Sequence, residues 1–127
     1  MFYWFYFADG IRSDAHKKPL IIWVQGGPGL AASGVGNFAE IGPLNMDFEL
    51  RNHTWVKQRN LLLFDHPVDT GFSYVTKTSL LVKTDKEMAS DLTKAIKMFY
   101  RKHKLFRKTP TYIIGQSYGG KICPRLA

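Results

Sequence analysis

The sequence predicts an α/β protein with a mixed sheet, on three observations. Two short apolar runs, 20–24 and 61–64, have the length and composition of strands that are buried on both faces. Between 84 and 106, apolar residues recur every three or four positions, which is typical of an amphipathic helix. A β-branched and aromatic run, 111–114, follows Pro110. Because strand, helix and strand follow in this order, we expect a right-handed crossover onto a parallel sheet.

The ends of these elements carry their own signals. Thr84 and Glu87 have the spacing of a capping box, which predicts the start of the helix. The aromatic run 1–8 ends at Asp9-Gly10, as a strand entering a hairpin does. It is short and has no basic residues before it, so we expect neither a signal peptide nor a membrane span. We expect residues 1–127 to form one partial domain.

Composition places the chain among globular proteins. Of its 127 residues, 45% are hydrophobic and 14% aromatic, which is enough for a core and excludes a disordered chain. Eighteen basic and ten acidic residues give a net charge of +8. Much of this charge lies on or just after the predicted helix, so a solvated helix face is expected; a polyanion site stays as the alternative, although no nucleic-acid-binding motif accompanies it. These residues are Lys94, Lys97, Arg101, Lys102, His103, Lys104, Arg107 and Lys108. We expect no nucleic-acid partner and no membrane partner.

Metal and disulfide chemistry find little support in the sequence. Cys123 is the single cysteine, so the chain forms no internal disulfide and has no cysteine pair for a metal. The histidines show no ligand spacing, and we expect each on the surface or in a loop. They are His16, His53, His66 and His103. No metal and no cofactor is expected.

A G-x-S-x-G motif ends the 111–114 run and predicts a nucleophile elbow. Gly115 and Gly119 flank Ser117, and glycines at these positions let the chain turn sharply from strand to helix with the serine Oγ projecting from the sheet. A glycine-rich turn with an incidental serine is the simpler alternative. A phosphate-binding loop is disfavoured, because Ile122 stands where that loop needs a hydroxyl for Mg²⁺.

Three distinctive loops follow predicted strands: 25–29 (QGGPG), 65–74 (DHPVDTGFSY) and 115–120 (GQSYGG). Ligand sites of parallel sheets lie at the carboxyl ends of the strands, so we expect these loops to converge on one site.

Together with Glu40-Ile41-Gly42-Pro43 and Pro124, these motifs resemble the serine carboxypeptidases of the α/β-hydrolase fold, and most closely their retinoid-inducible branch. The resemblance covers essentially the whole chain. It implies the N-terminal part of an α/β-hydrolase sheet, incomplete, with a crossover helix and a nucleophile elbow. It also implies a peptidase that releases C-terminal residues from peptides through an acyl-enzyme. The substrates would be peptides with a free C-terminal carboxylate.

By the same resemblance, Ser117 is the nucleophile, and the backbone N–H groups of Gly27 and Tyr118 form the oxyanion hole. The resemblance assigns substrate binding to Gln25, Gly26, Glu40 and Gln116. Gln116 replaces a glutamate of the family pattern. Its amide would donate a hydrogen bond to a substrate carboxylate at any pH, whereas a pair of carboxyl groups must hold a proton to do so. A polar residue tolerated beside the elbow is the alternative for Gln116.

Further departures bear on activity and location. Asp69 stands where the family has glycine, and a positive φ there would strain the loop by about 1 kcal/mol. The family's downstream Asp and His are missing from the 127 residues, so we expect this chain to be inactive alone. A non-catalytic peptide-binding remnant and a basic nucleotide or polyanion binder stay open. Asn52-His53-Thr54 is a glycosylation sequon and fits the secreted or lysosomal location that the resemblance implies. The sequence indicates no oligomeric state.

Overall fold

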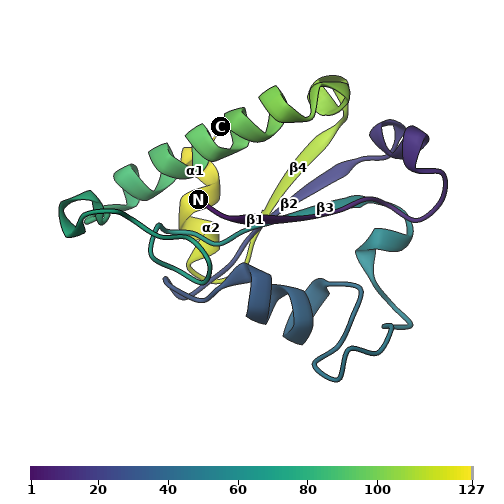
Figure 1. The fold of residues 1–127 in the computed structure, drawn as a ribbon, viewed down its shortest axis with the longest axis horizontal. Helices are drawn as coiled ribbons and strands as arrows, with labels where there is room; N and C mark the ends of the chain where they lie inside the picture. Colours follow the sequence, from purple (N-terminus) through teal and green to yellow (C-terminus); the bar gives the residue numbers. More distant parts are fainter. Residues whose placement is uncertain (127) are drawn as a thin grey trace.

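The computed structural model describes residues 1–126 and contains one four-stranded sheet between two layers of helical segments (Figure 1). The strands are β1 (Tyr3–Tyr6), β2 (Leu20–Val24), β3 (Asn60–Phe64) and β4 (Thr111–Gly115). Their order in the sheet is β1-β3-β2-β4. β2 runs parallel to both β3 and β4, and β1 runs antiparallel to β3. The α/β class and the mixed sheet are therefore confirmed.

The two faces of the sheet bury different side chains, because successive strand residues point to opposite faces. Helix α1 (Asp85–Lys102) covers one face with Leu92 and Phe99, and the short helix α2 (Gly119–Ile122) packs beside it (Figure 1). On the other face, a π-helical segment, Ala32–Ile41, and the turn Trp55–Lys57 cover Trp23 and Leu63. Strands β2 and β3 are buried along their whole length, as their apolar runs predicted.

Helix α1 begins where the capping box predicts. The Thr84 side chain accepts a hydrogen bond from the Glu87 backbone N–H at 3.2 Å, and the Glu87 carboxylate accepts one from the Thr84 N–H at 3.1 Å. The helix ends at Lys102, however, and not near Phe106. His103 leaves the helical conformation and stacks on Phe99 with ring centroids 4.5 Å apart. This bend lets Phe106 enter the core from a following 3-10 turn, Lys104–Lys108.

The predicted hairpin after β1 is wrong, although the strand itself is present. Asp9-Gly10 leads into a 3-10 helix, Arg12–Lys17, and β1 pairs with β3. The buried side chain of Asn60 supports this arrangement. Its Oδ1 accepts a hydrogen bond from the Ala8 N–H at 3.0 Å, and its Nδ2 donates to the carbonyl groups of Ala15 and Lys18, both at 2.8 Å.

His66 is in a loop, as expected, but it is not at the surface: only 3% of the residue is exposed. Its two ring nitrogens have no hydrogen-bond partner within residues 1–126. Burial lowers the pKa of His66 from its usual 6.5, because it disfavours the charged form. The nearby Gln25 backbone and the negative charge of Asp65 favour the charged form and raise the pKa, but they have the smaller effect. The folded chain therefore holds this imidazole neutral more strongly than the unfolded chain does.

This burial predicts a pH-dependent stability. The neutral His66 contributes its full share to the free energy of unfolding above the unfolded pKa of about 6.5. This share is lost as the pH falls below that value, because the unfolded chain then binds a proton more readily than the folded chain does. His103, whose pKa is also lowered by burial, acts in the same direction. Chemical denaturation between pH 7.5 and 5 should therefore show a falling free energy of unfolding, with a shallower slope in His66→Gln.

The exposed His53 provides the control. His53→Gln should keep the parent slope, and an unchanged slope in His66→Gln would show that His66 does not couple folding to protons.

Candidate active site

Ser117 occupies a sharp turn between β4 and α2. Its φ is +50°, which is uncommon for a residue with a side chain, and it is exposed at the carboxyl edge of the sheet. The Gln116 N–H donates to the Val24 carbonyl at 3.1 Å, and the Gly119 N–H donates to the Gln116 carbonyl at 2.8 Å. These bonds fix both arms of the turn. The geometry has the features of the predicted nucleophile elbow.

The flanking glycines are required by close backbone contact. A Cβ at Gly119 would lie 2.1 Å from the Val24 carbonyl oxygen, and a Cβ at Gly115 would lie 2.5 Å from the Gly119 carbonyl carbon. Helix α2 can therefore approach β2 and β4 only because neither residue has a side chain. The turn holds Ser117 in place through this packing.

The loop after β2 lies directly against the elbow. A Cβ at Gly26 would be 3.1 Å from both the Gln116 carbonyl oxygen and the Ser117 Cβ. Gly27 has a φ of +118°, a conformation that glycine adopts readily. Within residues 1–126, the backbone N–H groups of Gly27 and Tyr118 donate to no other protein group. An oxyanion hole requires backbone donors that are free in this way.

Gln25, Glu40 and Gln116 come from three different segments and form one hydrogen-bonded cluster, the polar clamp. Gln25 Nε2 donates to Glu40 Oε2 at 3.1 Å and to Gln116 Oε1 at 3.0 Å. Gln116 Nε2 donates to Glu40 Oε1 at 3.0 Å. Gln25 is buried, whereas Gln116 is exposed next to Ser117. The structure thus brings the three predicted polar side chains together beside the serine.

Trp23 orients the clamp, a role that the sequence analysis missed. Its indole N–H donates to Gln25 Oε1 at 2.6 Å. Since indole nitrogen is only a donor, this bond identifies the oxygen of the Gln25 amide and leaves its nitrogen facing Glu40 and Gln116. The sequence shows only a tryptophan two residues before a glutamine at the end of a strand. That pattern is too common to predict a hydrogen bond between the two side chains.

Asp65 organises the loops around the site and was also missed as a functional residue. Its buried carboxylate accepts hydrogen bonds from the Ser33 N–H at 2.8 Å, the Ser33 hydroxyl at 2.7 Å and the Phe72 N–H at 3.0 Å. It therefore joins the end of β3 to the π-helical segment and to the loop 67–74. In that loop Asp69 has a φ of +72°, so the glycine position of the family pattern does adopt the left-handed conformation here.

Tyr118 is anchored through its side chain. Its hydroxyl donates to the Asp85 carboxylate at the start of α1. This hydrogen bond raises the pKa of the Tyr118 hydroxyl, with desolvation and the Asp85 charge acting in the same direction. The residue that offers a free backbone N–H next to Ser117 is thereby tied to the long helix.

Two other kinds of site are not found in the described part of the chain. Residues 1–126 contain no cluster of three or more His, Cys, Asp and Glu side chains that could hold a metal ion. No helix among them has both the length and the hydropathy needed to cross a bilayer.

Comparison with known proteins decides the family. The family model described as serine carboxypeptidase matches residues 1–127. The chain belongs to the serine carboxypeptidase family. The retinoid-inducible serine carboxypeptidase of Mus musculus is 45% identical over 122 residues, which are 96% of this chain and 27% of the mouse protein. Serine carboxypeptidase-like 51 of Arabidopsis thaliana is 41% identical, with 99% of this chain and 28% of that protein covered.

A solved carboxypeptidase shares the fold. The crystal structure of Kex1, a prohormone-processing carboxypeptidase from Saccharomyces cerevisiae, superposes with a TM-score of 0.81 over 98% of this chain and 28% of that chain, at 24% identity. The chain thus spans 27% of the mouse relative and 28% of the Arabidopsis relative. The family resemblance that the sequence motifs predicted is confirmed, and so is the fold.

Adjacent glycines offer a direct test of the elbow. Gly119→Ala would drive a Cβ into the Val24 carbonyl, so we expect a loss of about 3 kcal/mol or more in the free energy of unfolding. A Cβ at Gly120 meets no atom within 4 Å, and Gly120→Ala in the same helix should be neutral or stabilising by up to about 1 kcal/mol. Denaturant titrations of both variants measure the difference. Equal effects would contradict the close packing of α2 on β2.

Proposed function

We propose that this chain supplies the nucleophile and the carboxylate-binding residues of a serine-type carboxypeptidase, which releases C-terminal residues from peptides through an acyl-enzyme on Ser117. One observation carries the proposal. An exposed serine on a nucleophile elbow lies beside a cluster of two amides and a carboxylate, and that cluster is suited to hold the free C-terminus of a peptide. Family membership supports the same reaction class.

In this reaction, the Ser117 Oγ would attack the last peptide carbonyl and form a tetrahedral intermediate. The carbonyl oxygen would become an oxyanion facing the free N–H groups of Gly27 and Tyr118. A general base would take the serine proton and pass it to the leaving amine, which departs as the free C-terminal residue. Water would then cleave the acyl-enzyme and regenerate the hydroxyl.

Specificity for the chain terminus would come from the polar clamp. The side-chain amides of Gln25 and Gln116 carry the N–H donors that a terminal carboxylate needs, and Trp23 holds the Gln25 amide in the required orientation. Gly26 packs against both Gln116 and Ser117, so the absence of a side chain there leaves room for the last residue of a substrate.

A second candidate is a peptide-binding protein without turnover. It needs only the polar clamp, in which the Gln25 and Gln116 amides are hydrogen-bonded to each other beside Ser117. The clamp alone would still recognise a C-terminal carboxylate. Binding of a peptide without cleavage distinguishes this candidate from the enzyme.

We also propose that the protein works in the secretory or lysosomal system. Asn52 begins a glycosylation sequon and is exposed, so an attached glycan would not disturb the core. Mobility on a gel before and after glycosidase treatment of the secreted protein tests the site, and Asn52→Gln should abolish any shift.

The 127-residue chain by itself should show no measurable hydrolysis of blocked dipeptides. A serine hydroxyl without a base is a weak nucleophile, and loss of the base removes several orders of magnitude in rate. A fluorophosphonate probe should therefore label Ser117 slowly, as followed by intact-protein mass spectrometry. Fast stoichiometric labelling that disappears in Ser117→Ala would show that a base is already in place.

The amide at position 116 predicts the pH dependence of a carboxypeptidase that carries this chain together with a general base. In Gln116→Glu, two clustered carboxyl groups would have to hold a proton in order to bind a carboxylate, so KM should rise more steeply above pH 5 than in the parent. The parent should keep peptidase activity nearer neutrality. Steady-state kinetics from pH 4 to 8 measure both profiles.

Lys121→Gln serves as the control because Lys121 lies on α2 outside the clamp. Its profile should follow the parent, and superimposable KM profiles for Gln116→Glu and the parent would exclude Gln116 from carboxylate recognition.

A further inference from the structure

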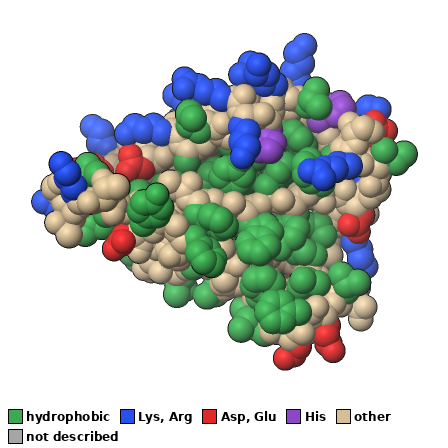
Figure 2. Space-filling view, viewed as in Figure 1, with side chains coloured by type: hydrophobic (Ala, Val, Ile, Leu, Met, Phe, Trp, Pro, Cys, Tyr) green, Lys and Arg blue, Asp and Glu red, His purple; other side chains and the backbone are tan. Residues whose placement is uncertain are grey.

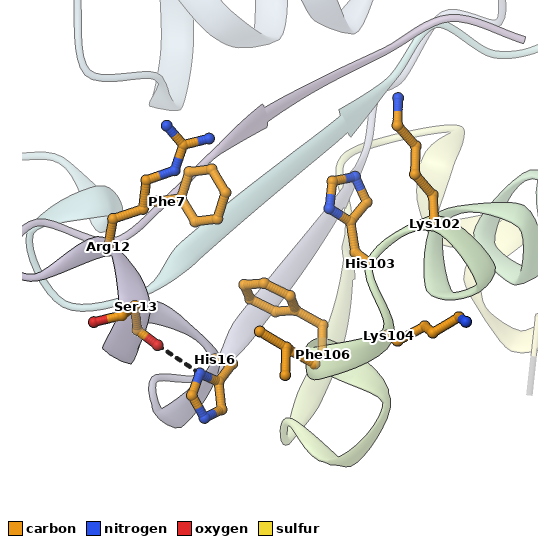
Figure 3. A pocket seen from close by; sticks show the side chains of 9 residues that line it. Phe7, Arg12, Ser13, His16, Lys102, His103, Lys104 and Phe106 are labelled. Atoms are coloured by element: carbon orange, nitrogen blue, oxygen red, sulfur yellow. Dashed lines mark hydrogen bonds between the residues drawn. The ribbon is translucent and has the colours of Figure 1, made fainter.

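A pocket lies at the opposite edge of the sheet from Ser117, where β2 and β4 begin. Its volume is about 440 Å³, which is in the range of small-molecule sites. One wall is the 3-10 helix Arg12–Lys17, and the other is the end of α1 with the turn Lys104–Lys108 (Figure 3). These walls are far apart in sequence.

The bottom of the pocket is aromatic. Phe7 and Phe106 approach with ring centroids 6.1 Å apart, and Phe106 is buried (Figure 3). Leu105 adds an apolar side chain that is 70% exposed. An apolar ligand body would cover mainly Leu105, because Phe106 is already buried, and would gain free energy from the removal of that surface from water.

The surroundings of this apolar floor are basic. Figure 3 shows Arg12 and His16 on one side and His103 and Lys102 on the other. Lys104 completes the basic groups, and no carboxylate lines the pocket. Within residues 1–126, the ion pairs are Lys17 with Asp14 and Lys94 with Asp91, so Arg12, Lys102 and Lys104 have no acidic partner. Figure 2 shows the wider accumulation of Lys and Arg along the α1 side of this face.

The C-terminus of α1 explains part of this charge, since cations at a helix C-terminus are favourable. It does not explain Arg12, which comes from a different segment. The Arg12 guanidinium lies over the Phe7 ring, with its Cζ 4.5 Å from the ring centroid. An unpaired guanidinium stacked on one ring of the pocket presents a fork of donors to an oxyanion beside it.

The two walls are held together without a ligand. The Thr109 hydroxyl donates to the His16 carbonyl at 2.6 Å, which joins the wall around Arg12 to the end of the turn Lys104–Lys108. Asn60 Nδ2 donates to the Ala15 carbonyl at 2.8 Å, which joins the same wall to the sheet. A pocket built in this way loses little conformational entropy when it binds a ligand.

We propose that this pocket binds a small amphipathic anion: an apolar or aromatic body on Leu105 and Phe106, with an oxyanion head group held by the Arg12 guanidinium on Phe7. Lys102 and Lys104 add positive charge around the pocket. The shared chemistry of the head group is that of a phosphate, sulfate or carboxylate. The site is separate from the polar clamp and does not depend on the proposed peptidase function.

Isothermal titration calorimetry on the 127-residue chain with 1-naphthyl phosphate tests the site. We expect at least about tenfold tighter binding than with inorganic phosphate or with 1-naphthol, because each of these supplies only half of the contacts. Parallel titrations with 1-naphthalenesulfonate and 1-naphthoate rank the head groups. Equal affinity for inorganic phosphate and the naphthyl ligand would overturn the proposal, since it would indicate diffuse charge attraction.

Matched variants locate the binding. Arg12→Gln should weaken 1-naphthyl phosphate binding by about tenfold, as expected for the loss of a charged hydrogen-bond donor, whereas Lys97→Gln on α1 outside the pocket should change it less than twofold. Leu105→Asp should abolish binding, and Met98→Asp, at a residue 57% exposed outside the pocket, should not. Ser117→Ala should have no effect. Equal losses within either pair would refute a site in this pocket.

Discussion

The parallel pairing of β2 with both of its neighbours is the constraint on which the site depends. Because β3 and β4 run in the same direction as β2, the three chains leave the sheet at one edge. The register pairs Val24 with Gly115, so the next residues, Gln25 and Gln116, emerge side by side. Asp65 leaves β3 at the same edge and draws in the segments that contain Ser33 and Phe72. A slip of one residue would turn these side chains to the opposite face.

Packing at this edge depends on missing side chains as much as on those present. Helix α2 can lie against β2 only because Gly119 faces the Val24 carbonyl, and a Cβ at Gly26 would make a tight contact of 3.1 Å with the Ser117 Cβ. The strained conformation of Ser117 is maintained by these contacts and by the hydrogen bonds of the turn. The close packing of Gly26 and Gly119 therefore stabilises the strained backbone of Ser117.

Features encoded in contiguous residues could be predicted from the sequence, and features that depend on distant contacts could not. The capping box of α1 and the two buried strands are local patterns, and the structure reproduces them. The pairing of β1 with β3 depends on Asn60, which lies far from the Asp9-Gly10 turn in sequence. The end of α1 depends on the stacking of His103 on Phe99, although the helical period continues to Phe106. The loop motifs predicted which polar side chains would gather, but not the Trp23 bond that orients them.

The polar clamp contains its own internal competitor. Both hydrogens of Gln25 Nε2 are already directed at oxygens of Glu40 and Gln116, and one hydrogen of Gln116 Nε2 is directed at Glu40. The two oxygens of Glu40 thus occupy donors that the terminus of a peptide would take. Entry of a ligand would replace one carboxylate by another, so its affinity would reflect the difference between two similar sets of hydrogen bonds and not their sum. Such an exchange favours rapid release over tight retention.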